Sequence, residues 1–114
     1  MIYVPILFFA AAAILGVTLV NMKRTGKGMP ISLARVHGLF AAVGLVALIL
    51  NVVADSANTL MNISLGLFVI VGLGGFTLVS FHLRKKALPE KLIVIHGVGA
   101  IVSFMLILVA AFNH

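Results

Sequence analysis

Four apolar stretches, separated by short polar connections, constrain the fold of this chain more than any other feature. They cover residues 2–21, 31–54, 60–81 and 92–112, and each has the roughly 20 residues that a helix needs to cross a bilayer. A segment in hydrocarbon must satisfy its own backbone polar groups, which favours helices. Hydrophobic residues make up 63% of the chain and charged residues 9%. We predict an all-α integral membrane protein, a four-transmembrane-helix bundle in one domain of residues 1–114.

The chain also aligns with itself at one ungapped shift of 59 residues, the separation of His37 from His96. Matches between aliphatic residues carry little weight in so apolar a sequence. The informative matches pair Gly16 with Gly75, Thr18 with Thr77, Pro30 with Pro89, and His37-Gly38 with His96-Gly97. We therefore predict two tandemly duplicated helical hairpins, residues 1–56 and 57–114, related by a pseudo-twofold axis along the membrane normal.

The basic residues indicate the orientation of the chain in the membrane. All eight flank the first and third connections, as Lys23, Arg24, Lys27 and Arg35, and as Arg84, Lys85, Lys86 and Lys91. The positive-inside rule places both basic loops in the cytoplasm and the N- and C-termini outside. The formal net charge of +6 is explained by this topology, so we expect a lipid bilayer and no nucleic acid as partner. A multi-pass protein of the bacterial inner membrane is predicted.

The connections also suggest where two helices begin. Pro30 and Pro89 are expected to open the second and fourth helices, where a missing N–H costs nothing. Glu90 follows at a helix N-terminus, where the dipole favours an anion. The chain has no cysteine, which excludes disulfides, thiolate metal sites and c-type haem attachment.

His37 and His96 are the candidate metal ligands. Each lies about two turns inside its helix, roughly 10 Å from the proline that precedes it. Intramembrane ionisable residues usually face the protein interior with a partner. One interpretation is structural: each neutral imidazole bonds a carbonyl or hydroxyl of a neighbouring helix, such as Thr18 or Thr77. The other is that both supply axial nitrogens to one haem b.

Small residues follow both histidines. Ala41 and Gly44 lie on the same helical stripe as His37, and Ala100 and Ser103 on that of His96. Gly38 and Gly97 come directly after the histidines and have no side chain to crowd a porphyrin. They either allow close helix packing or leave room for a flat ligand, and we predict that they line the cofactor. Arg35 and Lys91 are candidates to bind its propionates. His82 is interpreted as an interfacial residue. A zinc site is disfavoured, because two histidines leave a tetrahedral ion short of ligands.

On His37-Gly38, His96-Gly97 and the bundle they imply, the chain resembles membrane b-type cytochromes of the cytochrome b561-like kind. The resemblance implies a four-helix bundle whose helices donate paired histidines to haem. Those proteins commonly hold two haems, with histidines near both membrane faces. Here the outer halves of the helices contain no histidine before the terminal His114, so one haem is expected.

The leading functional hypothesis is electron transfer by a bis-histidine haem b protein, to or from quinone or a larger respiratory complex. A six-coordinate iron has no open position for oxygen chemistry. The protein is alternatively a non-catalytic accessory subunit of a larger membrane complex. A larger electron-transfer complex or a second copy of the chain in a homodimer is the expected protein partner. A third hypothesis is a small transporter similar in size to the small multidrug resistance proteins. Those use a glutamate in the first helix, which is absent here.

Overall fold

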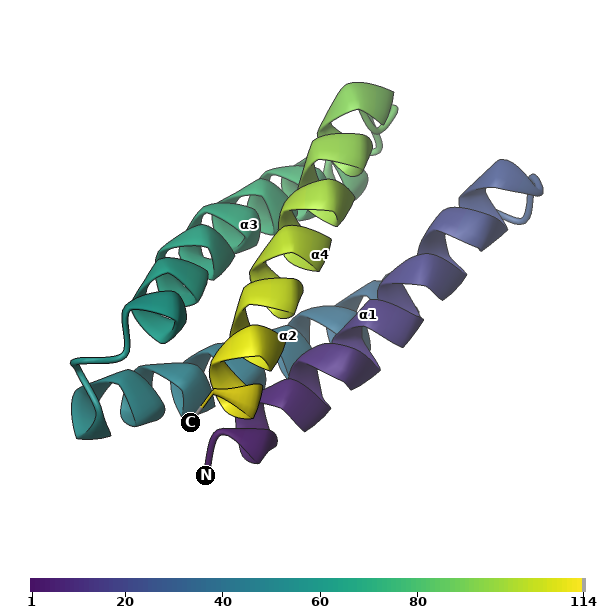
Figure 1. Cartoon of the computed structure of the whole chain (residues 1–114). Coiled ribbons are helices and arrows are strands. Elements are labelled where there is room, and N and C mark those ends of the chain that lie inside the picture. Colours follow the sequence, from purple (N-terminus) through teal and green to yellow (C-terminus); the bar gives the residue numbers. More distant parts are fainter. Residues whose placement is uncertain (114) are drawn as a thin grey trace.

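A computed structural model describes residues 1–113, which form four helices: α1 Tyr3–Arg24, α2 Ile31–Ala54, α3 Thr59–Leu83 and α4 Glu90–Phe112 (Figure 1). His114 lies outside the described residues. Each of the four is long and apolar enough to cross a membrane. The predicted all-α bundle of four transmembrane helices is confirmed, and the chain is a multi-pass integral membrane protein.

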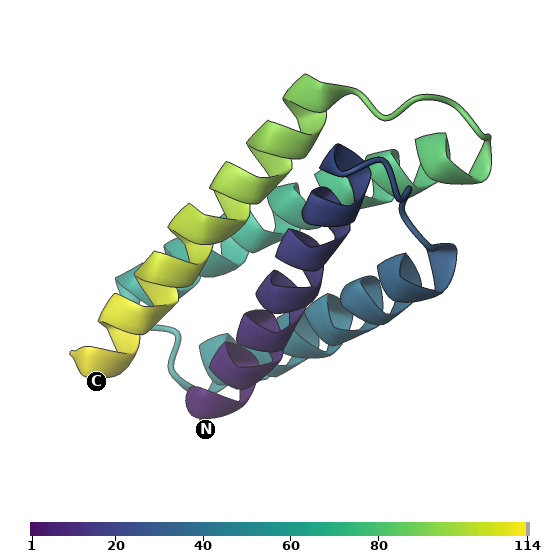
Figure 2. The same cartoon turned by 90° about the vertical axis from the view of Figure 1, so that its right-hand side faces the viewer.

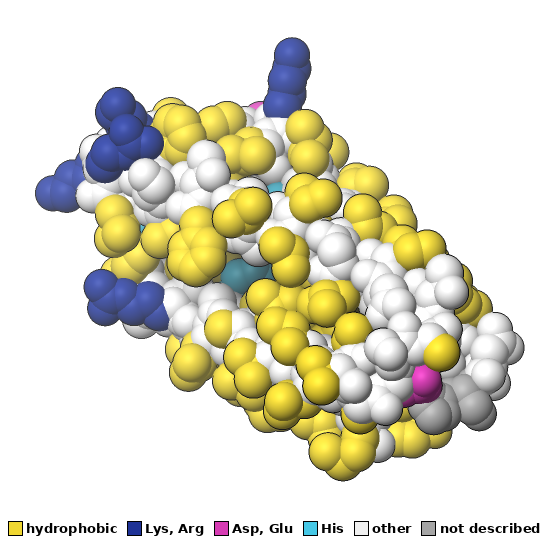
Figure 3. Space-filling view, turned by 90° about the vertical axis from the view of Figure 1, so that its left-hand side faces the viewer, with side chains coloured by type: hydrophobic (Ala, Val, Ile, Leu, Met, Phe, Trp, Pro, Cys, Tyr) yellow, Lys and Arg dark blue, Asp and Glu magenta, His cyan; other side chains and the backbone are white. Residues whose placement is uncertain are grey.

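The helices form two hairpins, α1 with α2 and α3 with α4, which lie side by side (Figures 1 and 2). Between the hairpins, α2 packs against α3 and α1 against α4, so that α2 and α4 lie diagonally across the bundle. The N-terminus and the α2–α3 connection lie at one end, which we call the terminal end. The other two connections carry the basic side chains at the opposite end, the basic end (Figure 3).

The hydrophobic core is concentrated toward the terminal end. Its centre is a stack of the Phe9 and Phe68 rings, 3.8 Å between centroids and 6° between planes. Leu48 and Ile107 beside it are fully buried. Toward the basic end the two hairpins diverge (Figure 1). The buried packing between the hairpins therefore lies mainly in the half of the bundle toward the terminal end.

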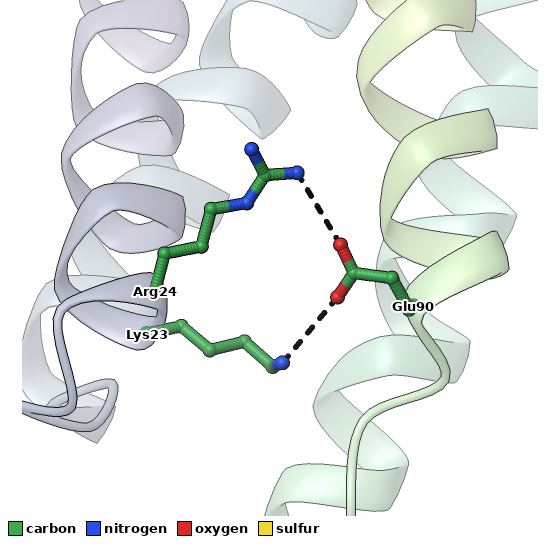
Figure 4. A network of polar contacts seen from close by, with 3 residues as sticks. All are labelled: Lys23, Arg24 and Glu90. Atoms are coloured by element: carbon green, nitrogen blue, oxygen red, sulfur yellow. Dashed lines mark hydrogen bonds and ion pairs between the residues drawn. The ribbon is translucent and has the colours of Figure 1, made fainter.

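Polar contacts bridge the hairpins at the basic end. The Glu90 carboxylate lies 3.5 Å from Lys23 Nζ and 3.3 Å from an Arg24 guanidinium nitrogen (Figure 4). These side chains are exposed, and such pairs contribute about 0–1 kcal/mol. Pro30 and Pro89 are the N-cap residues of α2 and α4. The prediction that the prolines open these helices is confirmed to within one residue.

The ends of α1 and α3 share one backbone geometry. In both, the second residue after the helix has a positive φ: Gly26 at 81° and Lys85 at 56°. The next N–H donates back to the third-last residue of the helix, from Lys27 to Met22 and from Lys86 to Phe81. These are Schellman motifs, in which glycine is preferred because an L side chain crowds the backbone at positive φ. Gly26 and Lys85 correspond under the 59-residue shift, but a duplicated origin stays a prediction.

Replacing Lys85 with glycine is expected to stabilise the protein by up to about 1 kcal/mol, because it removes the strain of a left-handed L residue. The measurement is the free energy of unfolding in mixed micelles, supported by Tm in detergent. Lys86→Gly removes the same charge at a residue without positive φ and is the control. A Lys85→Gly variant no more stable than Lys86→Gly contradicts the prediction.

Candidate functional site

His37 on α2 and His96 on α4 face each other across the diagonal of the bundle. Their ring centroids are 6.3 Å apart and the ring planes are inclined by 75°. The two helices do not contact one another, so the imidazoles bridge the space between them. Both side chains are half-buried. The structure thus brings together the two residues that the sequence singled out as metal ligands.

Each imidazole is held by the other helix of its own hairpin. His37 Nδ1 lies 2.7 Å from the carbonyl oxygen of Ala12, and His96 Nδ1 lies 2.9 Å from that of Val71. A carbonyl oxygen only accepts, so Nδ1 must be the protonated nitrogen that donates. In the neutral ring Nε2 then carries a lone pair and no proton. This is the tautomer and second-shell arrangement that metal-ligating histidines typically have.

Two glycines allow the imidazoles this close approach. A Cβ atom placed on Gly16 would lie 3.1 Å from His37 Cε1, and one on Gly75 would lie 3.1 Å from His96 Cε1. Both separations are tighter than ordinary van der Waals contact. The imidazole of each hairpin therefore packs on bare backbone of the neighbouring helix. The matched glycines of the sequence have a specific steric role here.

The carbonyls that orient the histidines could not be identified from the sequence, since every residue has one. The expectation of a partner on a neighbouring helix is confirmed, but the suggestion of Thr18 and Thr77 is wrong. Their hydroxyls donate within their own helices, to the carbonyls of Ile14 and Leu73. In a membrane helix a threonine can donate its hydroxyl hydrogen four residues back, and the two imidazoles contact the carbonyls of Ala12 and Val71 instead.

The glycines next to the histidines occupy open positions. A Cβ atom on Gly38 or on Gly97 would meet nothing within 4 Å, so protein packing does not require glycine there. Glycine in a helix interior costs about 1 kcal/mol relative to alanine. Ala41 and Ala100, one turn on from the histidines, are half-buried.

Gly44 and Ser103 take part in packing toward the terminal end. A Cβ on Gly44 would lie 3.1 Å from the Phe9 ring. Ser103 is fully buried; its hydroxyl donates to Gly99 O and its carbonyl accepts from Ser64 Oγ. These contacts account for both small residues without a cofactor, and their part in binding one stays a prediction.

The remaining predicted residues lie toward the basic end. Arg35 and Lys91 are exposed, on the first turns of α2 and α4. His82 lies in the last turn of α3, apart from the facing pair. Within residues 1–113, no group of three His, Cys, Asp or Glu side chains could hold a metal. Among these described residues, the facing imidazoles of His37 and His96 have no carboxylate or third histidine grouped with them.

Comparisons of this chain with known protein families, with curated proteins and with solved structures give no match. The resemblance to b561-like cytochromes stays a prediction, and the site is interpreted from its own geometry.

We predict that both facing histidines carry their proton on Nδ1 in the protein purified without cofactor. The reason is that each Nδ1 must donate to a helix carbonyl. The measurement is ¹⁵N NMR of histidine-labelled protein in lipid, where protonated and unprotonated ring nitrogens have separate chemical shifts. His37→Ala and His96→Ala variants assign the signals. A dominant Nε2–H tautomer at either residue contradicts the prediction.

Proposed function

We propose that this protein is a membrane haem b protein that transfers electrons, with His37 and His96 as the two axial ligands. The electron partner is quinone or a larger respiratory complex in a bacterial inner membrane. The basic end, with the haem near it, faces the cytoplasm. The observation that carries this proposal is the facing pair of imidazoles, each oriented by an Nδ1–H···O=C hydrogen bond.

The separation of the rings fits a single ion between them. Two metal–nitrogen bonds of about 2 Å place the ligating nitrogens about 4 Å apart, and adding a ring radius at each end gives centroids about 6 Å apart. The centroids lie at 6.3 Å. Two axial nitrogens suffice only when another group supplies the equatorial ligands, as porphyrin does. The absence of a third side-chain ligand within residues 1–113 therefore supports haem over zinc.

The surroundings of the pair are compatible with a flat group. Gly38 and Gly97, next to the two histidines, present no side chain, and a Cβ at either position would meet nothing within 4 Å. Arg35 lies toward the end where haem carboxylates would meet water, and charge-assisted hydrogen bonds to carboxylates are strong. This residue would bind and orient the group, while the apolar helices exclude water from it.

A bis-histidine haem supplies a one-electron couple. The chain itself contributes fixed imidazole orientation, through the carbonyls of Ala12 and Val71. Hydrogen bonding at Nδ1 raises the basicity of the ligating nitrogen. If His37 and His96 both held the iron, they would leave no position on it for substrate. Electron transfer follows as the function, rather than oxygen activation.

The proposal is tested by optical spectra of the detergent-purified protein, oxidised and then reduced with dithionite, with a pyridine haemochrome assay. About one haem b per chain and a low-spin reduced spectrum are expected. His37→Ala and His96→Ala should each retain less than about a tenth of the haem, because loss of an axial ligand exceeds the 10–100-fold effect of second-shell changes. His82→Ala is the matched control and should retain all of it. Full haem content in the double alanine variant overturns the proposal.

A second variant pair examines the orientation of His96 without removing it. Gly75→Val should weaken haem retention by about tenfold, because its side chain displaces the imidazole from its place on α3. Gly72→Val on the same helix is the control, since a Cβ there meets nothing within 4 Å. The measurement is the rate of haem transfer to apomyoglobin. Equal rates for the two variants would show that the close approach at Gly75 has no role in the site.

A further inference from the structure

A groove of about 240 Å³ lies between α3 and α4, lined by residues of these two helices alone. It extends along α4 from Leu92 to Val102, roughly 15 Å at the helical rise. Its rim residues Ile70 and Ile95 are 65% and 66% exposed, so the groove opens outward from the bundle. Both walls are membrane-spanning helices, and the surroundings it opens to are therefore lipid.

The wall of this groove is apolar except for one imidazole. His96 is its only polar lining residue, and the Nδ1 atom of His96 is already bonded to Val71 O. A ligand with several polar groups would lose its hydrogen bonds there. The volume also lies below the range of about 300–1,000 Å³ that holds drug-sized ligands. A slender hydrocarbon chain matches both the shape and the lining.

The first hairpin is packed differently at the corresponding place, where larger side chains stand on α1 and α2. The residues 59 positions before Leu67 and Gly99 are Phe8 and Phe40. Their rings pack together, with centroids 5.8 Å apart, across the contact between α1 and α2. Gly74 likewise corresponds to Leu15. The second hairpin therefore has smaller side chains at these three groove positions than the first hairpin has at the corresponding ones.

The positive charge near the mouth of the groove indicates that the head group of the ligand is anionic. The groove reaches Leu92, next to Lys91 and close to the connection that carries Lys85 and Lys86. No ion pair engages these three lysines within residues 1–113, whereas Lys23 and Arg24 of the first hairpin bind Glu90. Bases at a membrane surface attract anionic head groups. The apolar groove matches the acyl chain of an anionic lipid, and the lysines near its mouth match the head group of the same molecule.

We propose that the groove between α3 and α4 is a specific site for an anionic phospholipid. One acyl chain lies in the groove against His96, and the phosphate lies on Lys86 and Lys91 at the basic end. We expect no equivalent site in the first hairpin, because the Phe8 and Phe40 rings pack together at the corresponding place. The inference does not depend on haem, so a colourless protein would leave it intact.

The test uses full-length protein in nanodiscs that contain a phosphatidylglycerol probe with a diazirine in its acyl chain. After photolysis, mass spectrometry locates the labelled peptides, which are expected to come from α3 and α4 in excess over α1 and α2. Gly74→Leu should reduce this labelling by about tenfold, since leucine fills much of the groove. A Cβ at Gly74 makes only an ordinary 3.7 Å contact with His96. Leu67→Phe, which copies Phe8, is a second blocking variant.

Three controls separate the site from general contact with lipid. Gly66→Leu adds the same side chain to α3 outside the groove, where a Cβ meets nothing within 4 Å, and should leave labelling unchanged. Leu15→Gly combined with Phe40→Ala should open a groove in the first hairpin and add labelling of α1 and α2. Lys86→Gln and Lys91→Gln should each lower the preference for the anionic probe over a phosphatidylcholine probe by about fivefold.

Equal labelling of the two hairpins in the wild-type protein would overturn the proposal. So would labelling that Gly74→Leu and Leu67→Phe leave unchanged while both variants remain folded by circular dichroism and gel filtration. Displacement of the probe by an equimolar short-chain quinone, without preference for the anionic head group, would assign the groove to quinone instead.

Discussion

The interaction on which the site depends is the hydrogen bond from each imidazole Nδ1 to a carbonyl of the neighbouring helix. In hydrocarbon no water can satisfy a ring nitrogen, so the partner must come from protein. The carbonyls of Ala12 and Val71 each have a second lone pair beyond the one used in the helix. To donate to these carbonyls, each imidazole packs directly on the neighbouring helix. Glycine is needed beneath it, at Gly16 and Gly75, because a Cβ atom there would crowd the ring. The orientation of Nε2 follows from these contacts.

The two halves of the bundle differ in how the hairpins are held together. Toward the terminal end, the Phe9–Phe68 stack and the fully buried Leu48 and Ile107 close the space between hairpins. Toward the basic end the ribbons of the hairpins diverge (Figure 1). There the exposed Glu90 carboxylate of α4 forms ion pairs with Lys23 and Arg24 of α1. Membrane helices gain no hydrophobic stabilisation from associating and rely on packing. The buried packing between the hairpins is therefore concentrated in the half of the bundle toward the terminal end.

The two hairpins have one backbone plan but differ in their side chains. The histidine contacts correspond, as do the glycines beneath them and the Schellman motifs that end α1 and α3. The outer contacts do not correspond, since Phe8 and Phe40 pack together in the first hairpin whereas Leu67 and Gly99 line a groove in the second. The contacts that hold His37 and His96 near the centre of the bundle are the same in both hairpins. Residues on the outer face of each hairpin are free to differ, and there the second hairpin has a surface of its own.

The sequence by itself determined the helices and the class of protein, because the length of an apolar stretch and the lack of water in hydrocarbon leave few alternatives. The predicted 31–54 matches α2 residue for residue, and Pro30 and Pro89 mark two helix starts. The sequence also singled out His37 and His96 by their matched positions. Only the tertiary structure decided that the rings face each other, which carbonyls orient them, and that Gly44 packs on Phe9. These depend on how each helix is rotated about its axis, and in helices apolar on all sides no polar face specifies that rotation.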